Sequence, residues 1–139
     1  GLVRKEKYEL PPEAIREMII NAHCHRNLLD ESCIQVAVYD DRLEVTSPGG
    51  LYNGLTYEEV MNGHSKIRNK GIANIFSQMG LVEAWGSGIK RILNAAEEYG
   101  LPKPRFQEFD NMFRVELFRN SFPVTNEKEN IGGRVENRP

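Results

Sequence analysis

Two kinds of apolar spacing alternate along this chain, and the alternation constrains its fold more than any other feature. The first kind is helical: apolar residues at i, i+3, i+4 and i+7 begin at Ile15, just after a proline pair suited to a helix start. The second is strand-like: apolar and polar residues alternate over 34–38, and a turn leads into a second short strand over 43–46. Because helices and hairpin strands are interleaved, we expect an α/β (α+β) fold with a mixed or antiparallel sheet.

The rest of the chain continues the same alternation. Thr56 is followed three residues later by Glu59, a capping pattern that predicts the start of a short helix. Glycines at positions 80 and 100 suit the carboxyl-terminal ends of two amphipathic helices. The further expected elements are a short helix over 57–61, helices with apolar stripes over 72–79 and 89–96, and a hairpin over 106–118.

Length and charge fit a single domain. The chain has 139 residues, and its 18 basic and 20 acidic residues give a formal net charge of −2. There is no global basic excess, so DNA contact is expected only from a local patch or from another domain. We find no apolar run of membrane-spanning length and no signal-peptide core, and we expect a cytoplasmic domain without a membrane partner. We expect this domain over 1–120 and a disordered tail or linker over 121–139.

Glu17 and Asn21 form the first group of residues that could carry chemistry. They lie one turn apart on the expected first helix, with His25 one turn further along, on a face other than the apolar stripe. A carboxylate can take a proton from a water that attacks a phosphate, and an amide oxygen is a suitable magnesium ligand. The same residues would also be found on an ordinary solvated helix face.

Two glycine-containing segments form the second group. Gly-Ser-Gly at 86–88 stands where a helix begins, and the backbone N–H groups of a helix amino terminus bind phosphate. Ser-Pro-Gly-Gly at 47–50 directly follows a strand, where proline and glycine stop strand pairing and let the backbone approach a ligand. Taken alone, each segment is equally well explained as a tight turn.

In their order along the chain, these segments resemble the Bergerat fold of GHKL-type ATPases. The likeness is to the form found in bacterial proteins described as RecG-related ATP-dependent DNA helicases or transcriptional regulators, and it extends over about residues 8–118. The matching motifs are Leu-Pro-Pro-Glu-Ala-Ile-Arg-Glu at 10–17, Asn-Ala at 21–22 with His-Arg at 25–26, Tyr-Asp-Asp-Arg-Leu-Glu-Val at 39–45, Ser-Pro-Gly-Gly-Leu at 47–51, Ser65 with Arg-Asn at 68–69, and Trp-Gly-Ser-Gly-Ile at 85–89.

The resemblance implies a two-layer sandwich, with helices packed on one face of a mixed, largely antiparallel sheet, that binds ATP and Mg²⁺. It makes Glu17 the catalytic base and Asn21 the Mg²⁺ ligand. Arg68 would neutralise phosphate charge, and His25 with Arg26 matches a family pair to which we assign no role. The ATP-binding residues that it implies are Asn21, Ser47, Gly49, Gly86, Ser87 and Gly88, together with Ser65, Arg68 and Asn69 in the position of the nucleotide lid.

The chain departs from the family pattern at Ser47. Well-studied members begin this glycine loop with an aspartate that binds the adenine amino group, whereas a serine carries no charge. The chain also lacks the phosphate loop of a helicase motor, so the resemblance implies an ATP-binding module whose parent protein contacts DNA through other domains.

Two alternatives to a catalytic module follow from the sequence. One is a scaffold without catalysis that serves as an interaction or homodimerisation domain of a transcriptional regulator. Ser47 favours this scaffold, whereas the presence of both Glu17 and Asn21 favours ATP hydrolysis. The other is a winged helix over 72–89, which the absence of basic residues from 72–79 disfavours.

Overall fold

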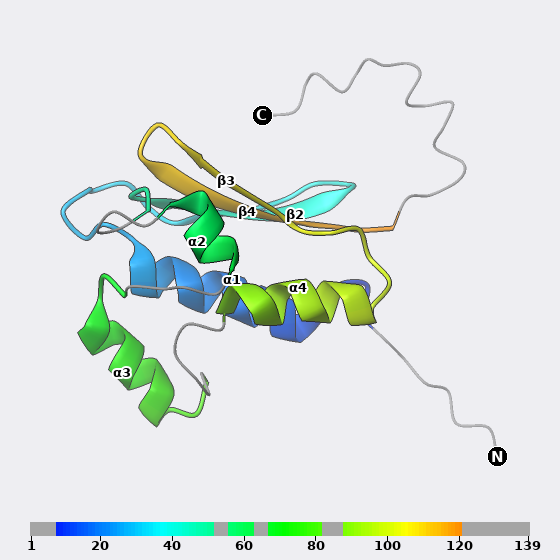
Figure 1. Ribbon diagram of the computed structural model, residues 1–139, viewed down its shortest axis with the longest axis horizontal. Helices are drawn as coiled ribbons and strands as arrows, with labels where there is room; N and C mark the ends of the chain where they lie inside the picture. Colours follow the sequence, from blue (N-terminus) through cyan, green and yellow to red (C-terminus); the bar gives the residue numbers. More distant parts are fainter. Residues whose placement is uncertain (1–7, 52–55, 63–66, 82–87, 121–139) are drawn as a thin grey trace.

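The computed structural model describes residues 8–51, 56–62, 67–81 and 88–120. Helices and strands alternate along them as the apolar spacing predicts, and Figure 1 shows their arrangement. The helices are α1 (Pro12–His25), α2 (Tyr57–Met61), α3 (Lys70–Gln78) and α4 (Gly88–Glu98), and the strands are β1 (Gln35–Val38), β2 (Arg42–Pro48), β3 (Arg105–Phe109) and β4 (Met112–Phe118). The disordered tail or linker expected over 121–139 lies outside the described residues.

The four described strands form one sheet in the order β1-β2-β4-β3, and every pairing among them is antiparallel. Strands β3 and β4 are joined through Asp110 and Asn111, whose positive φ angles of 48° and 59° suit a tight hairpin turn. The hairpin expected over 106–118 is therefore confirmed. The sheet is purely antiparallel within the described strands, where the resemblance allowed a mixed sheet.

Helices α1 and α4 pack beside each other against one face of this sheet (Figure 1). The core between the two layers includes Met18 of α1, Ile92 of α4, and Val45, Val115 and Leu117 of the sheet. The expected α+β fold with helices on one face is thus confirmed. Within the described residues, no helix is both long and apolar enough to cross a membrane.

The predicted helix ends are confirmed by their local geometry. Thr56 and Glu59 exchange side chain to backbone hydrogen bonds of 2.9 and 3.1 Å, which makes the start of α2 a capping box. Gly80 and Gly100 have φ angles of 77° and 72°, the left-handed conformation typical of a residue just after a helix.

Helix α3 differs from the sequence expectation in its packing. Its apolar stripe predicts a buried face, but Ile75 and Met79 are 58% and 63% exposed. The helix contacts α1 on the side away from the sheet, where Ala73 packs with Ile20 and Cys24 in a small separate cluster (Figure 1). A contact this narrow covers only part of an amphipathic stripe.

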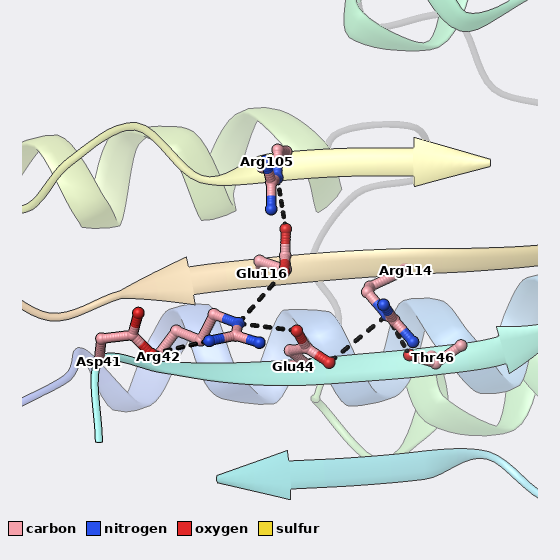
Figure 2. Close-up of polar contacts among 7 residues, drawn as sticks. All are labelled: Asp41, Arg42, Glu44, Thr46, Arg105, Arg114 and Glu116. Atoms are coloured by element: carbon pink, nitrogen blue, oxygen red, sulfur yellow. Dashed lines mark hydrogen bonds and ion pairs between the residues drawn. The ribbon is translucent and has the colours of Figure 1, made fainter. Parts of the chain in front are cut away.

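The sheet face opposite the helices carries a network of ion pairs (Figure 2). Glu44 and Glu116 stand directly opposite each other on β2 and β4, and both are at least 96% buried. Because facing carboxylates repel, they need a shared cation. Arg42 supplies it, with Nε 2.7 Å from Glu44 and 3.2 Å from Glu116. Burial raises the pKa of Glu116, but hydrogen bonds, chiefly from Arg105, hold the pKa below its ordinary value.

Candidate functional site

Glu17 and Asn21 point from α1 toward the first residue of α4. A Cβ atom on Gly88 would lie 3.3 Å from Glu17 Oε1 and 3.3 Å from Asn21 Oδ1, a tighter approach than side chains ordinarily make. The two side chains share a face because they are one helical turn apart, and the packing of α1 on α4 brings Gly88 to that face. The structure therefore brings together three residues that the sequence analysis selected from separate motifs.

Arg91 is a member of this group that the sequence analysis missed. It lies one turn after Gly88 on α4, and its Nη1 donates a hydrogen bond of 3.0 Å to Glu17 Oε2. Glu17 is 5% exposed, and burial raises its pKa, while the hydrogen bond and charge of Arg91 oppose that rise. One sequence signal could have indicated Arg91: it is a basic residue one turn after the Gly-Ser-Gly motif at 86–88, in the helix that follows.

The donor set at this point fits a magnesium ion that is shared with phosphate. Asn21 and Glu17 offer two hard oxygens close to one position, and Mg²⁺ at nucleotide sites takes one or two protein oxygens in addition to phosphate and water. Within the described ranges, no cluster of three or more His, Cys, Asp or Glu side chains could hold a metal ion. A metal ion at Asn21 would therefore need additional oxygens from a bound phosphate group and from water.

Arg68 and Asn69 lie at the carboxyl-terminal end of α1. Arg68 donates from Nε to the carbonyl oxygen of His25 at 2.9 Å and from Nη2 to that of Gly50 at 3.0 Å. Asn69 donates from Nδ2 to two carbonyl oxygens at the same helix end, at 3.0 and 2.9 Å. The last carbonyl groups of a helix have no partner within it, so these two side chains complete the end of α1 and tie it to the glycine loop.

His25 and Arg26 also have structural surroundings at this end. Burial lowers the pKa of His25 to about 4, and the neighbouring charge of Arg68 contributes. Arg26 donates from Nη2 to the carbonyl oxygens of Asp30 and Ser32, at 2.7 and 2.9 Å, and so fixes the loop after α1. The structure thus gives this His-Arg pair contacts that its sequence alone did not indicate.

The glycine loop after β2 is held from both sides. Asn27 donates its backbone N–H to the carbonyl of Pro48 at 2.7 Å, and Gly49 donates its own to the carbonyl of Asn111 at 2.6 Å. Gly49 has a φ of 108°, and a Cβ there would lie 2.9 Å from the backbone nitrogen of Asn27, so a side chain has no room. Ser47 is buried in β2, whose pairing with β4 continues through Pro48, so the strand end expected at 46 is wrong and the loop begins at Gly49.

A pocket of about 270 Å³ opens beside the glycine loop. It is lined by residues of four segments, among them Asp30, Gly49, Arg68 and Glu108. The predicted site residues therefore fall into two groups, one at the contact of α1 with Gly88 and one at the carboxyl-terminal end of α1. Ser65, Gly86 and Ser87 lie outside the described residues.

An antiparallel sheet backed by α1 and α4, with an acid–amide pair of α1 against a glycine that begins α4, is the arrangement expected of an ATPase-like domain of the GHKL class. Residues 31–117 match the family described as "Putative ATP-dependent DNA helicase recG C-terminal". The chain belongs to this family. The matched residues begin after α1, so they do not include Glu17 and Asn21.

A solved structure is similar as well. The crystal structure of the DIP2311 protein from Corynebacterium diphtheriae matches 86% of this chain, with a TM-score of 0.77 and 30% sequence identity. The chain spans 25% of the length of the DIP2311 chain. None of the curated proteins compared with the chain matches it.

Proposed function

We propose that this domain binds Mg-ATP between α1 and the start of α4 and hydrolyses it. In this proposal the domain is part of a cytoplasmic, DNA-associated regulator or helicase-related protein that contacts DNA through other domains. One observation carries the proposal: oxygens of Glu17 and Asn21 both lie 3.3 Å from where a side chain of Gly88 would begin. Membership of an ATPase-like family supports it.

The chemistry follows from what surrounds these residues. The amino terminus of α4 offers backbone N–H groups to phosphate oxygens, and α4 has 11 residues to support its dipole. Mg²⁺, when bound through Asn21, would neutralise phosphate charge. The raised pKa of Glu17 suits a base that accepts a proton from water. The water oxygen bonds to the terminal phosphorus, the bond to the ADP oxygen breaks, and the proton passes to Glu17.

A second candidate is a nucleotide-binding or dimerising scaffold without turnover. Two observations favour it. Arg91 binds one carboxylate oxygen of Glu17, and Ser47 offers no negative charge to the amino group of adenine. The two candidates differ in phosphate release, because the scaffold would bind a nucleotide or a second copy without hydrolysing ATP.

Calorimetric titration with ATP, in the presence and absence of Mg²⁺, tests the proposal. We expect the wild-type chain to bind Mg-ATP and Asn21→Ala to bind it about tenfold or more weakly, because removing metal-site groups has effects of this size. Asn94→Ala is the matched control, since Asn94 is an exposed asparagine on α4, six residues after Gly88. A wild-type chain that binds no nucleotide would overturn the proposal.

A further inference from the structure

We infer that Glu108 selects the base of the bound nucleotide by accepting a hydrogen bond from its amino group. The inference rests on the proposed function and adds to it the part of the molecule that recognises the base. It starts from the pocket beside the glycine loop and from the absence of a carboxylate at Ser47.

The carboxylate of Glu108 is fixed against the glycine loop. Its Oε2 accepts the backbone N–H of Leu51 at 2.8 Å, although Leu51 lies in the loop after β2, 57 residues earlier in the sequence. A Cβ at position 50 would lie 2.3 Å from the same oxygen, so Gly50 is what allows the carboxylate to approach the loop. The strand β3 thus brings a negative charge to the pocket.

The distance from the pocket to the Gly88 end of the site is one that a nucleoside triphosphate can span. Glu17 and His25 are eight residues apart on one face of α1, which corresponds to about 12 Å along the helix. The pocket is at the His25 end, because Arg68 lines it and donates to the carbonyl groups of His25 and Gly50. A nucleoside triphosphate with its phosphates at Gly88 can extend along this face and place its base in the pocket.

The chemistry of the pocket favours an amino-bearing base. A carboxylate is an acceptor with several lone pairs, so Glu108 can accept an amino N–H in addition to that of Leu51. Asp30 is a second carboxylate of the pocket, but it belongs to the irregular loop after α1, where its Oδ1 accepts the N–H of Ser32. Glu108 is held by a strand and contacts the glycine loop directly.

The test compares Mg-ATP with the Mg²⁺ complex of purine riboside triphosphate, which lacks only the 6-amino group. We expect wild type to bind ATP about tenfold more tightly than the analogue, the effect of one hydrogen bond to a charged group. Glu108→Ala should bring the ratio of the two dissociation constants close to one. Glu98→Ala, an exposed change on α4, should keep the wild-type ratio.

The ratio separates base selection from damage to the loop, since a disturbed loop weakens both nucleotides alike. If Glu108→Ala binds neither, Glu108→Gln keeps an acceptor for the N–H of Leu51 without the charge and should still lower the ratio. If the ratio of the two dissociation constants is the same in both Glu108 variants as in wild type, the inference is overturned. It is also overturned if only Asp30→Ala brings the ratio close to one. A wild type that binds both nucleotides equally would overturn the inference alone, whereas one that binds neither would also overturn the proposed function.

Discussion

The chemical character of Glu17 is set by a residue that lies far from it in sequence. The sequence predicted that Glu17 and Asn21 share a helix face, because helical periodicity is local. It did not predict Arg91, because the contact of Arg91 with Glu17 depends on how α1 packs against α4. The same reason kept Glu108 out of the sequence analysis, since its partner Leu51 belongs to another segment of the chain.

At this scale the base role of Glu17 is testable by substitution. Glu17→Gln should lower phosphate release from ATP by about 100-fold or more, the usual contribution of a general base, while ATP binding is retained. Glu13→Gln is the control, because Glu13 is an exposed residue one turn earlier on α1. Phosphate release that is the same in Glu17→Gln and wild type would remove Glu17 from this role.

At the scale of elements, the sequence predicted what is locally encoded and missed what depends on packing. Helix ends at Gly80 and Gly100 and the turn at 110–111 were predicted, because each needs a particular backbone conformation. The exposure of the apolar residues of α3 was not predicted, since amphipathic spacing does not indicate which neighbouring element, if any, covers the apolar face. The buried network around Glu116 was missed because strand alternation places charged residues on a solvated face.

The contact between α1 and α4 gives a prediction at Gly88. Gly88→Ala places a methyl group 3.3 Å from Glu17 Oε1 and Asn21 Oδ1, and these side-chain ends must rotate away. We expect Mg-ATP binding to weaken about tenfold or more, with the free energy of unfolding changed by less than about 1 kcal/mol.

Gly71→Ala is the control for this substitution. Gly71 is in α3 and a Cβ there meets no atom within 4 Å, so the variant should bind Mg-ATP as wild type does. Both changes introduce alanine for glycine in a helix, and only one of them reaches the site. Equal affinity of Gly88→Ala and wild type would show that this contact is not part of a nucleotide site.

At the scale of the whole molecule, the two faces of the sheet differ in character. The helix-covered face holds the core and the site residues, and the opposite face holds the arginine–glutamate network (Figure 2). Stability should depend on pH through groups of both layers, but in separate pH ranges. Because the pKa of Glu116 is reduced, its contribution to the free energy of unfolding is lost mainly as the pH falls below the ordinary value of 4.5. The reduced pKa of His25 lowers the free energy of unfolding at higher pH, mainly between 6.5 and 4.5.

His25 should therefore make the fold less stable in mild acid. In the unfolded chain its pKa is near 6.5, and in the fold it is about 4, so the unfolded state binds the proton first as the pH falls. The free energy of unfolding should fall by up to about 3 kcal/mol between pH 6.5 and 4. Urea unfolding at several pH values measures this slope.

The slope should flatten between pH 6.5 and 4.5 in His25→Gln and remain in His23→Gln, the exposed histidine of the same helix. Near pH 6 the contribution of Glu116 is small, because that carboxylate is largely ionised in both states. The raised pKa of Glu17 acts in the opposite direction in all variants, so the difference between the two histidine variants isolates His25. A slope that is identical in His25→Gln and wild type would contradict the assignment.

Amide hydrogen exchange of the wild-type chain, with and without Mg-ATP, tests the central claim most directly because it locates the ligand. The first N–H groups of α4 have no partner within the helix, so a bound phosphate should slow their exchange. We predict protection at the start of α4, in the second half of α1 and in the glycine loop, with β1 unchanged. No protection by Mg-ATP, or protection confined to α3 and β1, would contradict the account.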